Sequence, residues 1–211
     1  MQLIFVADPM CSWCYGFAKE LTTFSRAHPD LPLHIVVGGL RAGDTTVLDD
    51  EGKNFRLGHW ARVEAASGLP FNREAFLARQ GFVYDTEPIC RAVVTARKLA
   101  PQTDLLAVFR ALQHAFYVDG LDTTDGTVLA EVGAAALQDN GQAVTAEQFL
   151  AVWQAEATLG EAQTDFLHAR RWGVRSFPAL LIEIAGQLHT LSPGYAPADK
   201  LEANLRALLS V

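Results

Sequence analysis

The sequence predicts an α/β fold in which a mixed sheet is interrupted by a long all-helical insertion. Short apolar runs with strand character occur at residues 3–6 and 33–37, and again only after residue 178. Between these regions the apolar residues recur at helical spacing and no strand pattern is found. We therefore expect an outer domain formed by residues 1–45 and 158–211, and a helical insertion subdomain formed by residues 46–157.

The N-terminal elements predict a strand, a helix and a second strand. The continuous apolar run at residues 3–6 is typical of a strand that is buried on both faces. Residues 15–27 form the expected helix, since Phe17, Leu21 and Phe24 share one face. Because a helix joins the strands at 3–6 and 33–37, a right-handed crossover should place them parallel to each other.

The middle of the chain begins with an expected surface loop over residues 41–55 and continues with helices. Caps and apolar stripes mark each helix. The expected helices cover residues 57–67, a short stretch after Asn72, residues 87–99, residues 105–116, a stretch from Asp125 or Thr127 to Leu137, and residues 146–155.

The C-terminal part returns to the strand pattern after one more helix. Residues 161–172 form the expected helix, with Gly173 just after its end. The apolar stretches at 179–182 and 188–191 are separated by a tight turn at Gly186, which predicts an antiparallel hairpin. A final helix, beginning near Pro197, completes the chain.

Composition limits the function classes. The 211 residues carry a net charge of −7, which argues against nucleic acid and anionic membrane surfaces as partners. No apolar run is long enough to span a bilayer. The start of the chain lacks a basic segment and a cleavage site, so we expect no secretory signal and a cytoplasmic location. Three cysteines do not make a disulfide framework.

Cys11 and Cys14 form a C-x-x-C motif between the first strand and the first helix. This context is the sequence sign of a redox-active dithiol. The unpaired N–H groups and the dipole at a helix N-terminus stabilise a thiolate, and only the first cysteine can use that field while facing solvent. We therefore assign Cys11 as nucleophile and Cys14 as resolving thiol.

Several motifs resemble the DsbA family of thioredoxin-like oxidoreductases, in particular its signal-less, FrnE-like branch. The element order without the insertion is the thioredoxin order, and a helical insertion in its middle resembles DsbA. The resemblance covers essentially the whole chain. It is carried by Asp8-Pro9-Met10-Cys11-Ser12-Trp13-Cys14-Tyr15, Gly173-Val174-Arg175-Ser176-Phe177-Pro178-Ala179, Gly38-Gly39-Leu40, Glu87-Pro88-Ile89-Cys90-Arg91-Ala92 and Gly194-Tyr195.

The resemblance implies a cytosolic thiol–disulfide oxidoreductase, a reductase or isomerase. It implies a cis bond between Phe177 and Pro178, and substrate contacts from Phe177, Pro178, Ser12 and Trp13. The expected partners are protein or small-molecule disulfides and thiols. No bound cofactor or metal is implied, and glutathione is left open as a co-substrate. The oligomeric state is not determined by the sequence.

Two positions depart from the pattern of relatives and leave the direction of electron flow open. Trp13 stands where DsbA proper has a histidine before its second cysteine, and an indole does not supply charge to the thiolate. Phe5 stands where thioredoxin-like proteins often bury an acid.

Asp8 is expected either to accept from backbone N–H groups or to shape the turn, and Cys90 is expected to be a buried, inert thiol.

Three alternative functions remain. Cys11, Cys14, His28 and His34 match a zinc spacing, but prolines lie between the histidines and His34 falls in a strand, which spoils the geometry. Kappa-class glutathione transferases and 2-hydroxychromene-2-carboxylate isomerases resemble this fold, but usually carry a serine in the active-site loop; here Ser12 lies one residue past that position. A non-catalytic binding module with a vestigial dithiol is the third alternative.

Overall fold

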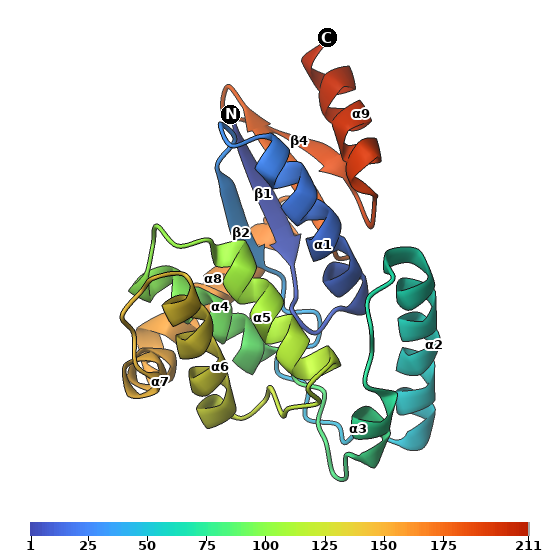
Figure 1. Ribbon diagram of the computed structural model, residues 1–211, viewed down its shortest axis with the longest axis vertical. Coiled ribbons are helices and arrows are strands. Elements are labelled where there is room, and N and C mark those ends of the chain that lie inside the picture. Colours follow the sequence, from blue (N-terminus) through green and yellow to red (C-terminus); the bar gives the residue numbers. More distant parts are fainter. Residues whose placement is uncertain (211) are drawn as a thin grey trace.

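The computed structural model describes residues 1–210 and contains a four-stranded mixed sheet with the strand order β2-β1-β3-β4 (Figure 1). The strands are β1 (Gln2–Ala7), β2 (Leu33–Val37), β3 (Ala179–Ile184) and β4 (Gln187–Ser192). As the sequence predicts, β1 is parallel to β2, and β3 and β4 form an antiparallel hairpin. Because β3 also pairs antiparallel with β1, the C-terminal hairpin completes the sheet on the side of β1 opposite to β2.

Helices cover both faces of this sheet. The helix α1 (Ser12–Ala27) lies on one face with α9 (Ala198–Leu209), and α8 (Glu156–Arg171) packs against the other. Alternate residues of β1 explain this arrangement, since Phe5 joins the core cluster that includes α1 whereas Ile4 and Val6 join the smaller cluster at α8. The active-site loop between β1 and α1 therefore begins at the end of a strand that is buried on both faces.

The insertion is helical, as predicted, and shares its core with the sheet. It contains α2 (Asp50–Ser67), α3 (Arg73–Ala78), α4 (Glu87–Leu99), α5 (Leu105–Tyr117), α6 (Gly126–Asp139) and α7 (Ala146–Gln154). The ring of Phe5 in β1 lies 5.6 Å from that of Phe17 in α1 and 5.5 Å from that of Phe109 in α5. The contact between Phe5 and Phe109 thus packs the insertion against the sheet. None of the described helices is long and apolar enough to cross a bilayer.

The starts of α2 and α8 differ most from the sequence prediction, whereas α1 begins three residues before the expected position. The prediction of a loop over 41–55 is wrong from Asp50 onward, because Asp49 caps α2 by accepting a hydrogen bond from the Gly52 N–H. Acidic residues in the first turn add a favourable interaction with the helix dipole. The helix α8 begins at Glu156 and not at residue 161, since Ala155 alone separates it from α7. The expected domain boundary at 157/158 falls in its first turn, and the division into two domains stays a prediction.

Candidate active site

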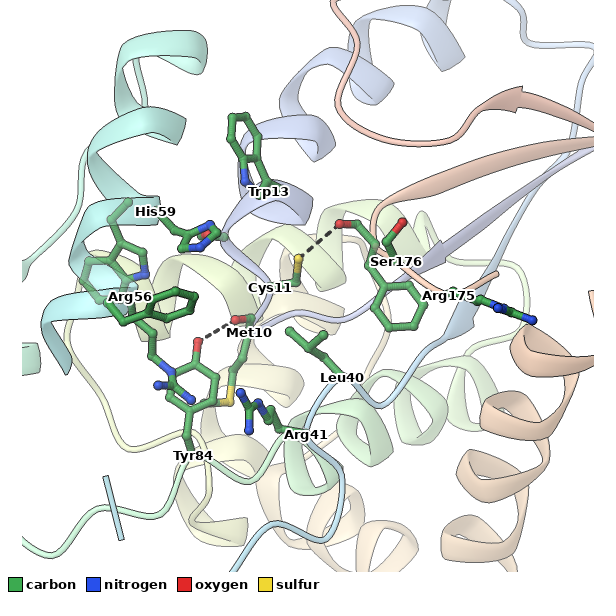
Figure 2. A pocket seen from close by; sticks show the side chains of 14 residues that line it. Met10, Cys11, Trp13, Leu40, Arg41, Arg56, His59, Tyr84, Arg175 and Ser176 are labelled. Carbon is green, nitrogen blue, oxygen red and sulfur yellow. Dashed lines mark hydrogen bonds between the residues drawn. The ribbon is translucent and has the colours of Figure 1, made fainter. Parts of the chain in front are cut away.

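Cys11 lies where β1, α1 and the loop before β3 meet. It is the N-cap residue of α1, with extended backbone angles, and its side chain is 7% exposed. The Cys11 Sγ lies 3.6 Å from the carbonyl oxygen of Phe177 and donates a hydrogen bond to it (Figure 2). The Cys11 sulfur is therefore placed at the helix N-terminus, where a thiolate is stabilised.

Cys14 lies one helical turn behind Cys11 and is fully buried. The two cysteines approach to 3.5 Å, and the structure describes both as thiols. Burial raises the pKa of the Cys14 thiol well above its usual range, and the neighbouring Cys11 adds to this through a hydrogen bond and its charge. Of the two sulfurs, only that of Cys11 is accessible to a substrate.

The loop from Arg175 to Pro178 forms the facing wall. The peptide bond between Phe177 and Pro178 is cis, as the resemblance implies, and Pro178 is buried. Among the described residues, no backbone hydrogen bond uses the N–H or the carbonyl of Ser176. An exposed backbone segment thus runs beside Cys11, with donor and acceptor groups open to a ligand.

A cavity of about 320 Å³ opens on one side of Cys11, within the size range of small-molecule sites. Its described lining contains three arginines and a histidine, and no acidic side chain. The lining residues are Met10, Cys11, Ser12, Trp13, Leu40, Arg41, Phe55, Arg56, His59, Trp60, Tyr84, Arg175, Ser176 and Phe177. Figure 2 shows Arg41 and Arg56 on the same side as Tyr84, and the Arg175 side chain turned away from Cys11. We call this space the cationic pocket.

Tyr84 holds one wall of the cationic pocket in place. Its hydroxyl donates a hydrogen bond of 2.5 Å to the carbonyl oxygen of Met10, and its ring lies 4.3 Å from the guanidinium carbon of Arg56. Burial raises the pKa of the Tyr84 hydroxyl, so it remains a neutral donor. Desolvation lowers the pKa of His59, and the charges of Arg62 and Arg56 add to this, which favours the neutral imidazole. The positive charge of the pocket therefore comes from arginine.

A second, uncharged space lies on the other side of the active-site loop. It has a volume of about 370 Å³, and we call it the neutral groove. It is lined by Trp13, Ser176, Phe177, Pro178, Pro193, Gly194 and Tyr195. The rings of Trp13 and Tyr195 lie 5.6 Å apart, and the Tyr195 hydroxyl donates to the carbonyl oxygen of Ala66. Trp13, Ser176 and Phe177 line both spaces and therefore form the boundary between the cationic pocket and the neutral groove.

Asp8 is a fully buried acid directly below the dithiol. Its Oδ1 accepts from the Met10 N–H at 2.9 Å, and its Oδ2 accepts from the Leu40 N–H at 2.7 Å and from the Cys90 Sγ at 3.6 Å. Burial raises the pKa of Asp8, although these donors and the Thr86 hydroxyl pull it down. Of the two expectations for Asp8, acceptance from backbone N–H groups is confirmed.

The remaining sequence candidates are also placed. Cys90 is fully buried, as expected; burial raises the pKa of its thiol, and the charge of Asp8 adds to this. His28 contacts the carboxylate of Glu202 at 2.6 Å, and His34 is exposed on β2. Over residues 1–210 no group of three or more His, Cys, Asp or Glu side chains is arranged to hold a metal ion.

Sequence reasoning missed the side chains that give the cationic pocket its chemistry. Arg41 follows β2, Arg56 and His59 lie three residues apart on α2, and Tyr84 precedes α4. The spacing of Arg56 and His59 indicates a shared helix face, but the helix was expected to begin at residue 57, one position after Arg56. No local pattern connects these three segments to the C-x-x-C motif.

Comparison with known proteins identifies the family. The structure matches a candidate protein disulfide isomerase from Nitrosomonas europaea with a TM-score of 0.88 and 32% identity, covering 99% of this chain and 97% of that one. It also matches the cytosolic disulfide reductase DsbM from Pseudomonas aeruginosa with a TM-score of 0.79 and 26% identity, covering 100% and 99% of the two chains. A structure of that reductase with glutathione matches with a TM-score of 0.78 at the same identity, over 100% of both chains.

No family model and no curated protein matches the sequence at the level searched. The assignment therefore depends on the solved structures, and on 32% identity that extends over nearly the full length of both chains. With the mixed sheet, the helical insertion and the dithiol at the start of α1, this similarity shows that the chain belongs to the DsbA family of thioredoxin-fold oxidoreductases.

Proposed function

We propose that this protein is a thiol–disulfide oxidoreductase that reduces or isomerises disulfides through Cys11 and Cys14 in the cytoplasm. The observation that carries the proposal is the placement of the two sulfurs. Cys11 lines the cationic pocket at a helix N-terminus, and the buried Cys14 approaches it to 3.5 Å. One cysteine is thus placed to meet a substrate and the other to attack the first.

The reaction proceeds by two exchanges. The Cys11 thiolate attacks one sulfur of a substrate disulfide, forms a mixed disulfide and expels the other sulfur as a thiolate, which takes up a proton. Cys14 then loses its proton and attacks Cys11 Sγ, which releases the second substrate thiol and leaves a Cys11–Cys14 disulfide. External thiols restore the dithiol. In the reverse direction the same steps oxidise a substrate, and release from Cys11 alone results in isomerisation.

The surroundings of Cys14 support reduction over oxidation as the net direction. The strongly oxidising members of the superfamily stabilise their thiolate form. In this protein, three features near the dithiol do not stabilise a thiolate. The nearest described acid is Asp8, the residue before the second cysteine is the uncharged Trp13, and burial raises the pKa of the Cys14 thiol. The 26% identity to a cytosolic disulfide reductase, over the whole of this chain, also supports this direction and a cytoplasmic location.

Glutathione is the external thiol that we propose. The structural neighbour solved with glutathione supports a small thiol as ligand in this fold. The arginines of the cationic pocket add a chemical reason, since glutathione carries two carboxylates. A glutathione transferase or 2-hydroxychromene-2-carboxylate isomerase activity would need no Cys11–Cys14 disulfide, so the redox test below separates that alternative from our proposal.

The experiment is an insulin-reduction assay beside a scrambled-ribonuclease assay, on wild type, Cys14→Ser and Cys90→Ser. We expect Cys14→Ser to lose insulin turnover and to accumulate a mixed disulfide at Cys11, because the resolving step is missing. Isomerase activity that survives in Cys14→Ser would identify isomerisation as the principal reaction. Cys90→Ser is the matched control and should keep both activities. Wild-type protein that is inactive in both assays would contradict the proposal.

A further inference from the structure

The cationic pocket and the neutral groove share Trp13, Ser176 and Phe177 in their lining, and the two spaces differ in charge. The cationic pocket contains arginine and lacks described acidic side chains, although the whole chain has 24 acidic and 17 basic residues. The neutral groove is lined by aromatic, proline, glycine and serine residues and by no charged side chain. A disulfide that reaches Cys11 therefore enters the cationic pocket, and the neutral groove adjoins that pocket at Trp13, Ser176 and Phe177.

The cationic pocket suits a small carboxylate-bearing thiol. Arg41 has a side chain 51% exposed, with Asp44 at 3.6 Å as its described ion-pair partner. Arg56 is half-buried and makes one described hydrogen bond, from Nη1 to the carbonyl oxygen of Gly52. Because a guanidinium has five donor N–H groups, both arginines retain donors that can reach a carboxylate.

The neutral groove suits an extended polypeptide. Ser176 presents an unpaired backbone N–H and carbonyl along its edge, and these groups can pair with a strand as a sheet edge does. Trp13, Tyr195 and Pro193 form an apolar wall for side chains of that strand.

We propose that the preferred substrate class is the mixed disulfide between a protein cysteine and glutathione. The glutathionyl half lies in the cationic pocket and the polypeptide lies in the neutral groove. This inference rests on the proposed function, because it assigns a substrate to the same dithiol. Because the cationic pocket and the neutral groove adjoin each other, one substrate that reacts with Cys11 can occupy both.

The reaction balances with glutathione as the only co-reactant. The Cys11 thiolate attacks the glutathionyl sulfur, the protein–glutathione S–S bond breaks, and the protein thiolate leaves and is protonated. Cys14 then attacks Cys11 Sγ, releases glutathione and forms the Cys11–Cys14 disulfide. Two further glutathione thiols reduce that disulfide and leave as oxidised glutathione, which restores the enzyme with two electrons from the small thiol.

The first test compares two forms of one cysteine peptide, one in mixed disulfide with glutathione and one with uncharged 2-mercaptoethanol. We expect wild type to have a kcat/KM about tenfold higher for the glutathionyl form, which is about 1.4 kcal/mol of recognition. Arg41→Gln and Arg56→Gln should each lower this ratio by about fivefold or less, the size of one exposed ion pair. Arg26→Gln, an exposed arginine near the end of α1 outside the pocket lining, is the matched control and should leave the ratio unchanged.

The second test concerns the groove and compares the glutathionyl peptide with oxidised glutathione. Gly194 lines the groove, and a Cβ atom added there meets no atom within 4 Å, so Gly194→Leu starts a side chain in open space beside the groove. We expect Gly194→Leu to lower the kcat/KM ratio of peptide to oxidised glutathione about fivefold. Gly160→Leu, at an equally open position on α8, is the matched control.

The outcomes distinguish this inference from the proposed function. Equal kcat/KM values for the two peptide forms in wild type, or arginine variants that slow both forms equally, would overturn the inference while leaving the enzyme a disulfide reductase. Failure to reduce either peptide form, oxidised glutathione or insulin would overturn the proposed function itself.

Discussion

Replacing Cys11 by serine is expected to lower disulfide exchange by roughly three orders of magnitude or more, because a serine hydroxyl is not ionised at neutral pH and forms no disulfide. The change exchanges one sulfur atom for oxygen at the N-cap position of α1 and leaves the backbone of the helix start intact, so the protein should fold normally. Insulin reduction measures the loss, and circular dichroism before and after heating checks the fold.

Cys90→Ser is the matched control for this prediction. It exchanges sulfur for oxygen at the buried thiol, and it keeps a donor directed at Asp8 Oδ2. Activity of Cys90→Ser should remain within about twofold of wild type, because Cys90 is fully buried and faces neither the cationic pocket nor the neutral groove. If Cys90→Ser lost activity while Cys11→Ser kept full activity, the nucleophile would be Cys90 on α4, and our account would be contradicted.

The second large effect is expected at Asp8, on stability. Asp8→Ala leaves the N–H groups of Met10 and Leu40 without their acceptor in the interior. The expected cost is about 3–5 kcal/mol of unfolding free energy, the range found when one partner of a buried charged network is removed. Urea unfolding measures it. Asp139→Ala, at an exposed acid near the end of α6, should change the unfolding free energy by less than about 0.5 kcal/mol.

Wild type and Asp8→Ala should also differ in how the unfolding free energy depends on pH, and the sign of this difference follows from the pKa of Asp8. Since the pKa of Asp8 is raised in the folded protein, the folded state binds more protons than the unfolded state above about pH 4. The stability that protonation contributes is complete below the unfolded pKa of 3.8 and is lost as pH rises through the folded pKa. The unfolding free energy of wild type relative to Asp8→Ala should therefore fall as pH rises from 4. A difference that grows over this range would contradict the raised pKa.

Much of the fold could be predicted because its signals are local. Three local signals each predict the structure of their own segment, and all three structures occur as expected. They are the continuous apolar run of β1, the turn at Gly186 and the capping box at Thr145. The start of α2 was missed because Asp50 and Gly52 are common in loops, whereas the carboxylate of Asp49 accepts from the Gly52 N–H and makes them the first turn of a helix.

The site could be predicted only as far as its local part. The position of Cys11 and Cys14 on α1 follows from one short segment, and the cis bond at Pro178 came from family resemblance, since cis bonds are only about 5–6% of X–Pro bonds. The contacts of Asp8 with Leu40 and Cys90 join residues 32 and 82 positions apart. The parallel pairing of β1 with β2 brings Leu40 near Asp8, and packing of the insertion brings Cys90 near it. No pattern within one element predicts either contact.

The most direct test of the central claim is a map of the three cysteines after oxidation. The protein is treated with oxidised glutathione, alkylated, digested and analysed by mass spectrometry, before and after reduction. Our account predicts a Cys11–Cys14 disulfide that forms and is reduced reversibly, with Cys90 alkylated only after unfolding. A protein in which Cys11 and Cys14 never form this disulfide, or in which Cys90 reacts first, would contradict it.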